Sequence, residues 1–194
     1  MAKKAVLRYW EGKFRLEAAQ LSSLKYFCPT IMSLSSPHPL WVSASSSSYE
    51  ISKATVQARM LSGRYRTESL SSHWSSNSNG WCLTPLCVGE KVVEDLDHIL
   101  SSCPSLDQTR RNLQFFTRKF AASNPIILPV LEAFCNPEHP LFCQFLLDCS
   151  CIPAVNALAC YYGATFLDKL FYIGRTWCYS LLRDRARLLN RWHL

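Results

Sequence analysis

Apolar residues recur every three or four positions along most of this chain, and that spacing predicts helices rather than strands. Gly63 is a typical helix stop, and the hydroxyl of Thr67 can cap a short helix that follows it. We therefore predict a mainly α-helical fold. The expected helices cover residues 3–27, 51–61, 106–122, 129–135, 139–149, 154–162 and 164–192.

One apolar stretch, residues 141–167, is long enough to be weighed as a membrane span. Asp148 and Asn156 lie inside it, and Pro153 divides it into two pieces that are each too short to cross a bilayer. We predict two buried helices here and no membrane partner.

The composition predicts the kind of partner, through the net charge, and the redox state of the compartment, through the cysteines. The formal net charge of +7 favours polyanions such as nucleic acid, although it does not identify one. Ten cysteines without an apolar leader at the start of the chain predict a reducing, intracellular compartment, nuclear or cytoplasmic, in which most thiols are buried.

Four potential metal ligands stand in the segment WCLTPLCVGEKVVEDLDHILSSCP: Cys82, Cys87, His98 and Cys103. Thiolates and imidazole are the ligands that structural zinc prefers, in a tetrahedral arrangement. Five residues of α-helix advance about 500°, so His98 and Cys103 share a face only if the chain leaves the helix before Cys103. Pro104 favours that exit. We predict a zinc site at these four residues.

Three other interpretations remain open. The four residues could be a core histidine with buried cysteines, or His73 could replace His98 as a ligand. Cys135, His139 and Cys143 form a second spaced set, which we interpret as core or interface because prolines and apolar residues surround it.

Arginines flank the cysteine segment on both sides. Arg59, Arg64 and Arg66 bracket a turn that contains Tyr65, and Arg110 and Arg111 open the next helix. Arginine beside an aromatic ring suits phosphate contacts and base stacking, and it equally suits a structural turn with solvated side chains. We predict that these five arginines bind nucleic acid.

These patterns divide the chain into four segments. They are a basic amphipathic helix (1–27), a Pro/Ser-rich linker (28–49), a zinc-knuckle-like module with flanking helices (50–122) and a C-terminal helical region (123–194). The expected architecture is a small irregular zinc-bound module followed by a helical bundle.

Several motifs resemble the region that follows the reverse transcriptase domain in non-LTR (LINE-like) retrotransposon polyproteins. They are ARMLSGRYRTESLSSHWSSNSNGWCLTPLC, EDLDHILSSCP, FLLDCSCIP and RTWCYSLLRDRARLL. In that family an acidic residue shortly before His-x4-Cys-Pro belongs to a zinc-binding module, which implies zinc at the four ligands here and Glu94 or Asp95 as the acidic residue.

The chain departs from the polymerase itself. It has no aromatic-x-Asp-Asp sequence and no consecutive aspartates, the carboxylates that a two-metal polymerase site needs. We therefore expect no enzymatic activity, and we expect a zinc-binding fragment that binds RNA or single-stranded DNA. The alternatives are a structural brace or protein-interaction module that uses the C-terminal helices, or a remnant without function.

Overall fold

The structure is a computed structural model that describes residues 2–21, 24–27, 37–44 and 47–190. Half of the predicted linker, residues 28–36 and 45–46, falls outside these ranges. Within them the chain is helical, and an isolated antiparallel bridge between Trp81 and Val93 is the nearest approach to a strand. The prediction of a mainly α-helical fold is confirmed.

The described α-helices follow the predicted order, except that α2 lies inside the segment predicted as a linker. They are α1 (Ala2–Gln20), α2 (Pro39–Val42), α3 (Ser48–Leu61), α4 (Glu68–Ser72), α5 (Asp107–Ala122), α6 (Leu128–Phe134), α7 (Phe142–Asp148), α8 (Pro153–Tyr162) and α9 (Ala164–Leu188). Short turns connect some of them: a π-helical turn η3 (His98–Ser102) and the 3₁₀ turns η4 (Pro104–Leu106), η5 (Pro125–Ile127) and η6 (Cys149–Cys151).

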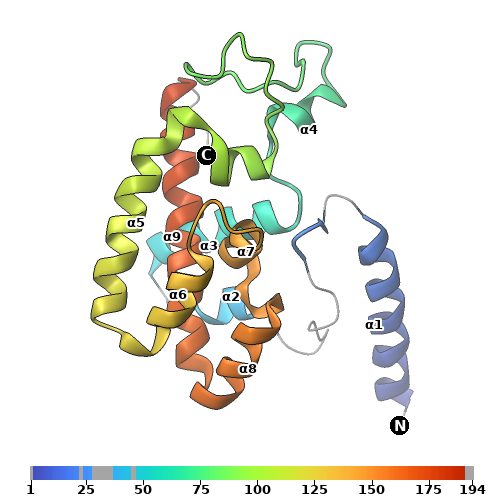
Figure 1. Cartoon of the computed structure of the whole chain (residues 1–194). Coiled ribbons are helices and arrows are strands. Elements are labelled where there is room, and N and C mark those ends of the chain that lie inside the picture. Colours follow the sequence, from blue (N-terminus) through green and yellow to red (C-terminus); the bar gives the residue numbers. More distant parts are fainter. Residues whose placement is uncertain (1, 22–23, 28–36, 45–46, 191–194) are drawn as a thin grey trace.

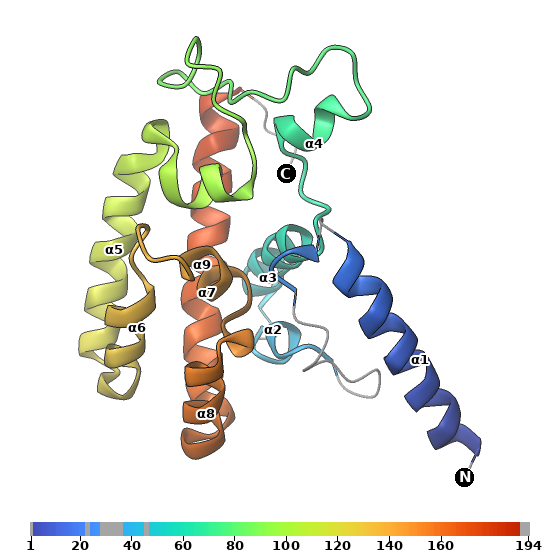
Figure 2. The same ribbon diagram turned by 45° about the vertical axis from the view of Figure 1, so that its right-hand side comes forward.

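Helix α9 is the axis of the bundle. It runs along the length of the molecule, with α5 to α8 beside it (Figures 1 and 2), and it contacts α2, α3, α5, α7 and α8. Trp177 of α9 is fully buried, where its ring meets Phe142 edge to face and its indole nitrogen donates to Thr117 Oγ1 at 2.9 Å. One core therefore joins helices from the predicted module and from the predicted C-terminal region.

The backbones of α7 and α9 approach closely at Gly174. A Cβ atom at this position would lie 2.4 Å from the carbonyl oxygen of Leu146 and 2.9 Å from Nε2 of Gln57. That same Gln57 nitrogen donates to Leu146 O at 2.6 Å and to Leu147 O at 3.2 Å. Glycine therefore allows α3, α7 and α9 to meet at one point.

The apolar stretch 141–167 forms α7, η6, α8 and the first residues of α9. The carboxylate of Asp148, its one acidic residue, has hydrogen-bond partners within the protein. Asp148 is fully buried; its carboxylate accepts from Ser150 N at 3.2 Å and from Cys151 Sγ at 2.9 Å, and Nε2 of His38 lies 3.2 Å from it. Among the described residues no single helix has the length and apolar character to cross a bilayer. Residues Phe142–Cys151 and Pro153–Tyr162 meet that criterion only as a pair bent by 45°.

Helix α1 stands away from the bundle (Figure 2). Ala18 near its end is buried and Phe14 packs edge to face on Phe27, whereas Tyr9 and Trp10 are more than half exposed. The expected amphipathic helix forms, but it ends at Gln20 instead of continuing to residue 27, and Phe14 and Ala18 pack from its C-terminal half.

We predict that Gly174→Ala destabilises the protein. The added methyl group would overlap the Leu146 carbonyl, and overpacking of this kind costs about 1–3 kcal/mol. Thermal unfolding followed by circular dichroism measures the effect. Gly12→Ala is the matched control, because a Cβ there meets nothing within 4 Å and alanine favours a helix. Equal melting temperatures for Gly174→Ala and wild type would contradict the close approach.

Candidate metal centre and adjoining basic pocket

Four side chains converge on one point at the end of the bundle. The sulfurs of Cys82, Cys87 and Cys103 and a ring nitrogen of His98 all lie within 4.8 Å of one another, and all four residues are buried. Cys87 Sγ is 3.5 Å from His98 Nε2 and 3.8 Å from Cys103 Sγ. These four residues are close enough to hold a metal ion.

The first two cysteines come from a tight loop. Cys82 N donates to Val92 O at 2.8 Å and Glu94 N donates to Gly80 O at 2.9 Å, so the two ends of the loop run side by side. Inside the loop, the amide of Cys87 donates to Thr84 O at 2.9 Å and closes a turn that points both sulfurs inward.

A π-helical turn brings His98 and Cys103, the second pair of candidate ligands, to the same side of the chain. Cys103 N donates to His98 O at 2.7 Å, five residues back, and Cys103 itself is extended. In a π turn, residues five apart lie nearly above one another, which an α-helix does not allow. The chain therefore leaves the α-helical path before Cys103, as the sequence required, but through a widened turn rather than a simple end.

Hydroxyl groups form a second layer around the ligands. Thr84 is fully buried, with its Oγ1 3.1 Å from Cys82 Sγ and 3.3 Å from Cys103 Sγ. Ser102 Oγ lies 3.4 Å from His98 Nδ1, the ring nitrogen that faces away from the sulfurs. Such partners fix the orientation of metal ligands and set the histidine tautomer.

Burial sets the protonation of the ligands. It raises the pKa of the three thiols and lowers the pKa of His98, so the imidazole is neutral, the form that binds a metal. A bound cation stabilises thiolates and takes the place of the thiol protons, so metal binding releases protons.

The alternative ligands His73, Cys135, His139 and Cys143 do not form a metal-binding cluster among the described residues. His73 is exposed and outside the cluster. His139 Nδ1 accepts from Leu141 N at 3.1 Å, and its ring packs edge to face on Phe134. Burial raises the pKa of Cys143 to about 12, so this thiol behaves as a protonated core residue. In the described part of the chain, the four converging residues are the one such group.

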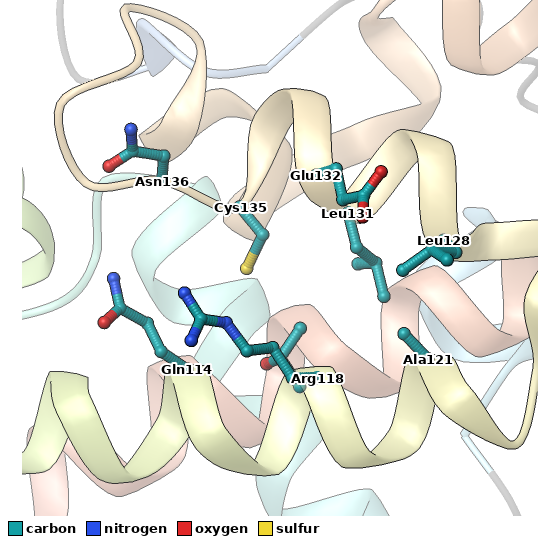
Figure 3. Close-up of a pocket in the computed structure, with 9 residues that line it drawn as sticks. Gln114, Arg118, Ala121, Leu128, Leu131, Glu132, Cys135 and Asn136 are labelled. Atoms are coloured by element: carbon teal, nitrogen blue, oxygen red, sulfur yellow. The ribbon is translucent and has the colours of Figure 1, made fainter.

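A hollow of about 580 Å³ lies between α5 and α6 (Figure 3). The sulfur of Cys135 points into it beside Arg118, and Gln114 and Glu132 lie on its walls. Burial raises the pKa of Cys135 to about 12, so its thiol is a poor nucleophile. The hollow therefore offers no argument for thiol catalysis.

A buried ion pair joins the segment 80–103, which we call the metal module, to helix α9 of the bundle. Both carboxylate oxygens of Glu94 accept from the guanidinium of Arg185 on α9, one of them from Nε at 3.1 Å. Glu94 Oε1 also accepts from Glu68 N at 2.9 Å, and Arg185 donates to Tyr65 OH at 3.3 Å. Sequence reasoning considered Glu94 or Asp95 as the acidic residue of the module. Glu94 is buried in the ion pair with Arg185, whereas Asp95 Oδ1 accepts from His98 N at 2.8 Å.

The turn after α3 brings two predicted arginines together. Gly63 has a positive φ of 65°, with Gly63 N donating to Met60 O at 3.0 Å and Arg64 N donating to Arg59 O at 2.8 Å. This is the Schellman pattern that ends a helix at glycine. Thr67 Oγ1 then accepts from Leu70 N at 3.0 Å and caps α4, as predicted.

Arg59, Arg64 and Arg66 line one cavity of about 590 Å³, which we call the basic pocket. All three are exposed, and Arg66 donates from Nε to Ser71 Oγ at 3.1 Å. The rest of its wall comes from the turn before α4, from α4 and the polar turn after it, and from the end of α9 and the residues that follow. These residues include Tyr65, Ser75, Asn77, Ser78, Arg185 and Asn190.

The other two predicted arginines lie on α5, outside this pocket. Arg111 is exposed, whereas Arg110 is only 4% exposed and its guanidinium donates to the carbonyl of Cys103 and to Asp107. We therefore remove Arg110 from the nucleic-acid set, because it fastens α5 to a metal ligand. Sequence reasoning missed Arg185 and Thr84; the basic run RDRARLL pointed to the first, and nothing in the sequence singled out the second.

Comparison of the chain with protein-family models, with curated proteins and with solved structures finds no match. The resemblance to retrotransposon polyproteins therefore stays a prediction.

We predict that the purified protein carries about one metal ion per chain. Cys87→Ser and His98→Ala each remove a ligand and should lose most of that metal, which inductively coupled plasma mass spectrometry measures. Cys160→Ser is the control, because this exposed cysteine lies outside the cluster. Metal content equal in all four proteins would contradict the assignment.

We also predict that Glu94→Ala destabilises the fold by about 3–5 kcal/mol, because it leaves the Arg185 guanidinium buried without its partner. The double variant Glu94→Leu, Arg185→Met removes both charges and should unfold at a higher denaturant concentration than Glu94→Ala. Urea titration followed by circular dichroism compares them. A double variant less stable than the single one would argue against a buried pair.

Proposed function

We propose that this chain is a non-catalytic, zinc-stabilised module that binds RNA or single-stranded DNA. The observation that carries the proposal is the basic pocket, where Arg59, Arg64 and Arg66 line one cavity whose wall also holds Glu68 and Arg185, the two partners of Glu94. Arginine guanidinium groups match phosphate oxygens in geometry and charge.

Zinc is the metal that the ligand set supports best. A tetrahedral ion with zinc–sulfur bonds of about 2.3 Å and zinc–nitrogen bonds of about 2.0 Å separates two sulfurs by about 3.8 Å, and a sulfur from a nitrogen by about 3.5 Å. The corresponding distances from Cys87 are 3.8 Å to Cys103 Sγ and 3.5 Å to His98 Nε2. Three thiolates and one imidazole also form a complete structural zinc shell.

Zinc would hold the module, because the loop buries little apolar surface of its own. Leu86, Val88 and Val93 are each more than half exposed, while the cysteines beside them are buried. A loop built in this way depends on its metal for a fixed shape. We infer that the zinc ion keeps the segment 80–103 in place and, through the contacts of Glu94 with Glu68 and Arg185, supports the wall of the basic pocket.

The charges in the pocket favour a polyanion. Within the described residues Arg59 and Arg64 form no ion pair, so their guanidinium groups are available to a ligand. Glu94 neutralises Arg185, and Glu68 adds a carboxylate to the wall. A pocket with moderate positive charge and serine and asparagine side chains suits a phosphodiester backbone without base-specific readout.

The resemblance to non-LTR retrotransposon polyproteins agrees with this role, since a fragment from behind a polymerase domain would keep RNA or single-stranded DNA close to the enzyme. Free thiols suit a reducing, intracellular compartment, nuclear or cytoplasmic.

A protein-interaction role is the second candidate, and one observation favours it. Helix α1 exposes Val6, Tyr9, Trp10 and Leu16, and it stands away from the bundle (Figure 2). An exposed apolar helix of this kind suits a protein partner better than a phosphate backbone. In this second proposal the partner contacts α1, whereas the sequence suggested the C-terminal helices.

We predict salt-dependent binding to single-stranded oligonucleotides. Arg64→Gln together with Arg66→Gln should lower affinity and reduce the slope of log K against log salt by about 1.4, because each lost phosphate contact contributes about 0.7. Fluorescence anisotropy at several salt concentrations measures both effects. Lys119→Gln is the control, because this exposed residue lies near the far end of α5.

Two outcomes would overturn the proposal. One is an affinity that stays constant from low to high salt. The other is an equal loss of affinity in the double arginine variant and in Lys119→Gln.

A further inference from the structure

Trp74 is 79% exposed, the most exposed tryptophan in the described chain. It stands directly after α4, where Trp74 N donates to Ser71 O at 3.1 Å and Ser75 N donates to the same oxygen at 3.0 Å. Ser71 and Ser75 both line the basic pocket. The exposed indole is therefore carried by the stretch of chain that forms this wall of the cavity.

The backbone that carries this indole is anchored on both sides. Thr67 caps α4 before it, and Ser78 Oγ after it donates to Glu68 O at 2.9 Å. Gly80, with a φ of 81°, passes so close to α4 that a Cβ there would lie 3.3 Å from Ser72 Oγ. The exposed ring of Trp74 is thus carried by a backbone segment that hydrogen bonds fix on both sides.

We propose that Trp74 is a stacking platform for an unpaired base of a single-stranded nucleic acid whose phosphates lie on the arginines of the basic pocket. This inference rests on the proposed function and narrows it. The face of an exposed indole accepts any base, and stacking of one base on an aromatic ring accounts for a large part of the affinity for single strands.

Single strands fit this arrangement better than a duplex. In a duplex the bases are already stacked inside the helix, so an exposed indole on the segment that walls a phosphate-binding pocket has no base face to meet. In a single strand, neighbouring bases and phosphates are free to turn to different partners. The polar wall, with Ser75 and Asn77, offers hydrogen-bond partners to sugar and base edges.

The test compares a fluorescently labelled single-stranded DNA oligonucleotide with an abasic oligonucleotide of the same length. We expect Trp74→Ala to weaken binding of the normal oligonucleotide about tenfold and to leave binding of the abasic one within about twofold of wild type. Trp74→Leu, which keeps an apolar side chain but no aromatic face, should behave like Trp74→Ala. Trp10→Ala is the matched control, because it removes a half-exposed indole from α1, far along the chain from the pocket.

The outcomes separate this inference from the proposed function. If Trp74→Ala and Trp74→Leu bind the normal oligonucleotide as wild type does while the double arginine variant weakens it, the stacking platform is wrong and phosphate binding stands. If the arginine variant also binds as wild type does, the proposed function fails as well. Equal losses on normal and abasic oligonucleotides, or an equal loss in Trp10→Ala, also overturn the platform. Circular dichroism and metal content of each variant confirm that the fold is retained.

Discussion

The buried pair between Glu94 and Arg185 is the interaction on which the candidate site depends. Two opposite charges leave water together, and each gains further partners: a backbone amide of α4 for the carboxylate and the Tyr65 hydroxyl for the guanidinium. Buried charges are tolerated only when paired and hydrogen-bonded in this way. Because the partners come from the metal module, from α4 and from α9, one pair fixes the relative placement of all three. Tyr65 and Arg185 are also walls of the basic pocket, so the pair shapes the cavity as well as the fold.

The metal module is fastened to the bundle from a second side. The guanidinium of Arg110, nearly inaccessible to solvent, donates to the carbonyl of Cys103, and Leu86 N donates to Ser105 Oγ at 2.9 Å. A cationic donor on that carbonyl orients the peptide that carries a metal ligand. A metal ion held by the four clustered residues would therefore constrain the same short stretch of chain as helix packing does. An ion bound at this position would stabilise the start of α5 together with its own loop.

Much of the architecture could be predicted from the sequence, because local rules decide it. Helical periodicity located the main helices, Gly63 and Thr67 marked a stop and a cap, and the four ligands of the cluster were identified from residue type and spacing. The π turn at 98–102 could not be predicted, since nothing in HILSSCP distinguishes a five-residue hydrogen bond from the usual four-residue one. The burial of Arg110 was equally hidden, because its partner is a backbone carbonyl that any residue would supply.

Not every arginine near the module is equivalent, and hydrogen-bond partners make the difference. The guanidinium groups of Arg110 and Arg185 are buried and bind partners within the fold. The side chains of Arg59, Arg64 and Arg66 are exposed and line the pocket. Glu68 and Glu94 offset part of the guanidinium charge at this place. A net charge of +7 for the whole chain therefore overstates the attraction that a phosphate meets in the pocket. With few effective charges, a ligand held there needs an additional contact that does not depend on salt, and the exposed indole of Trp74, on the segment that walls the pocket, would supply one.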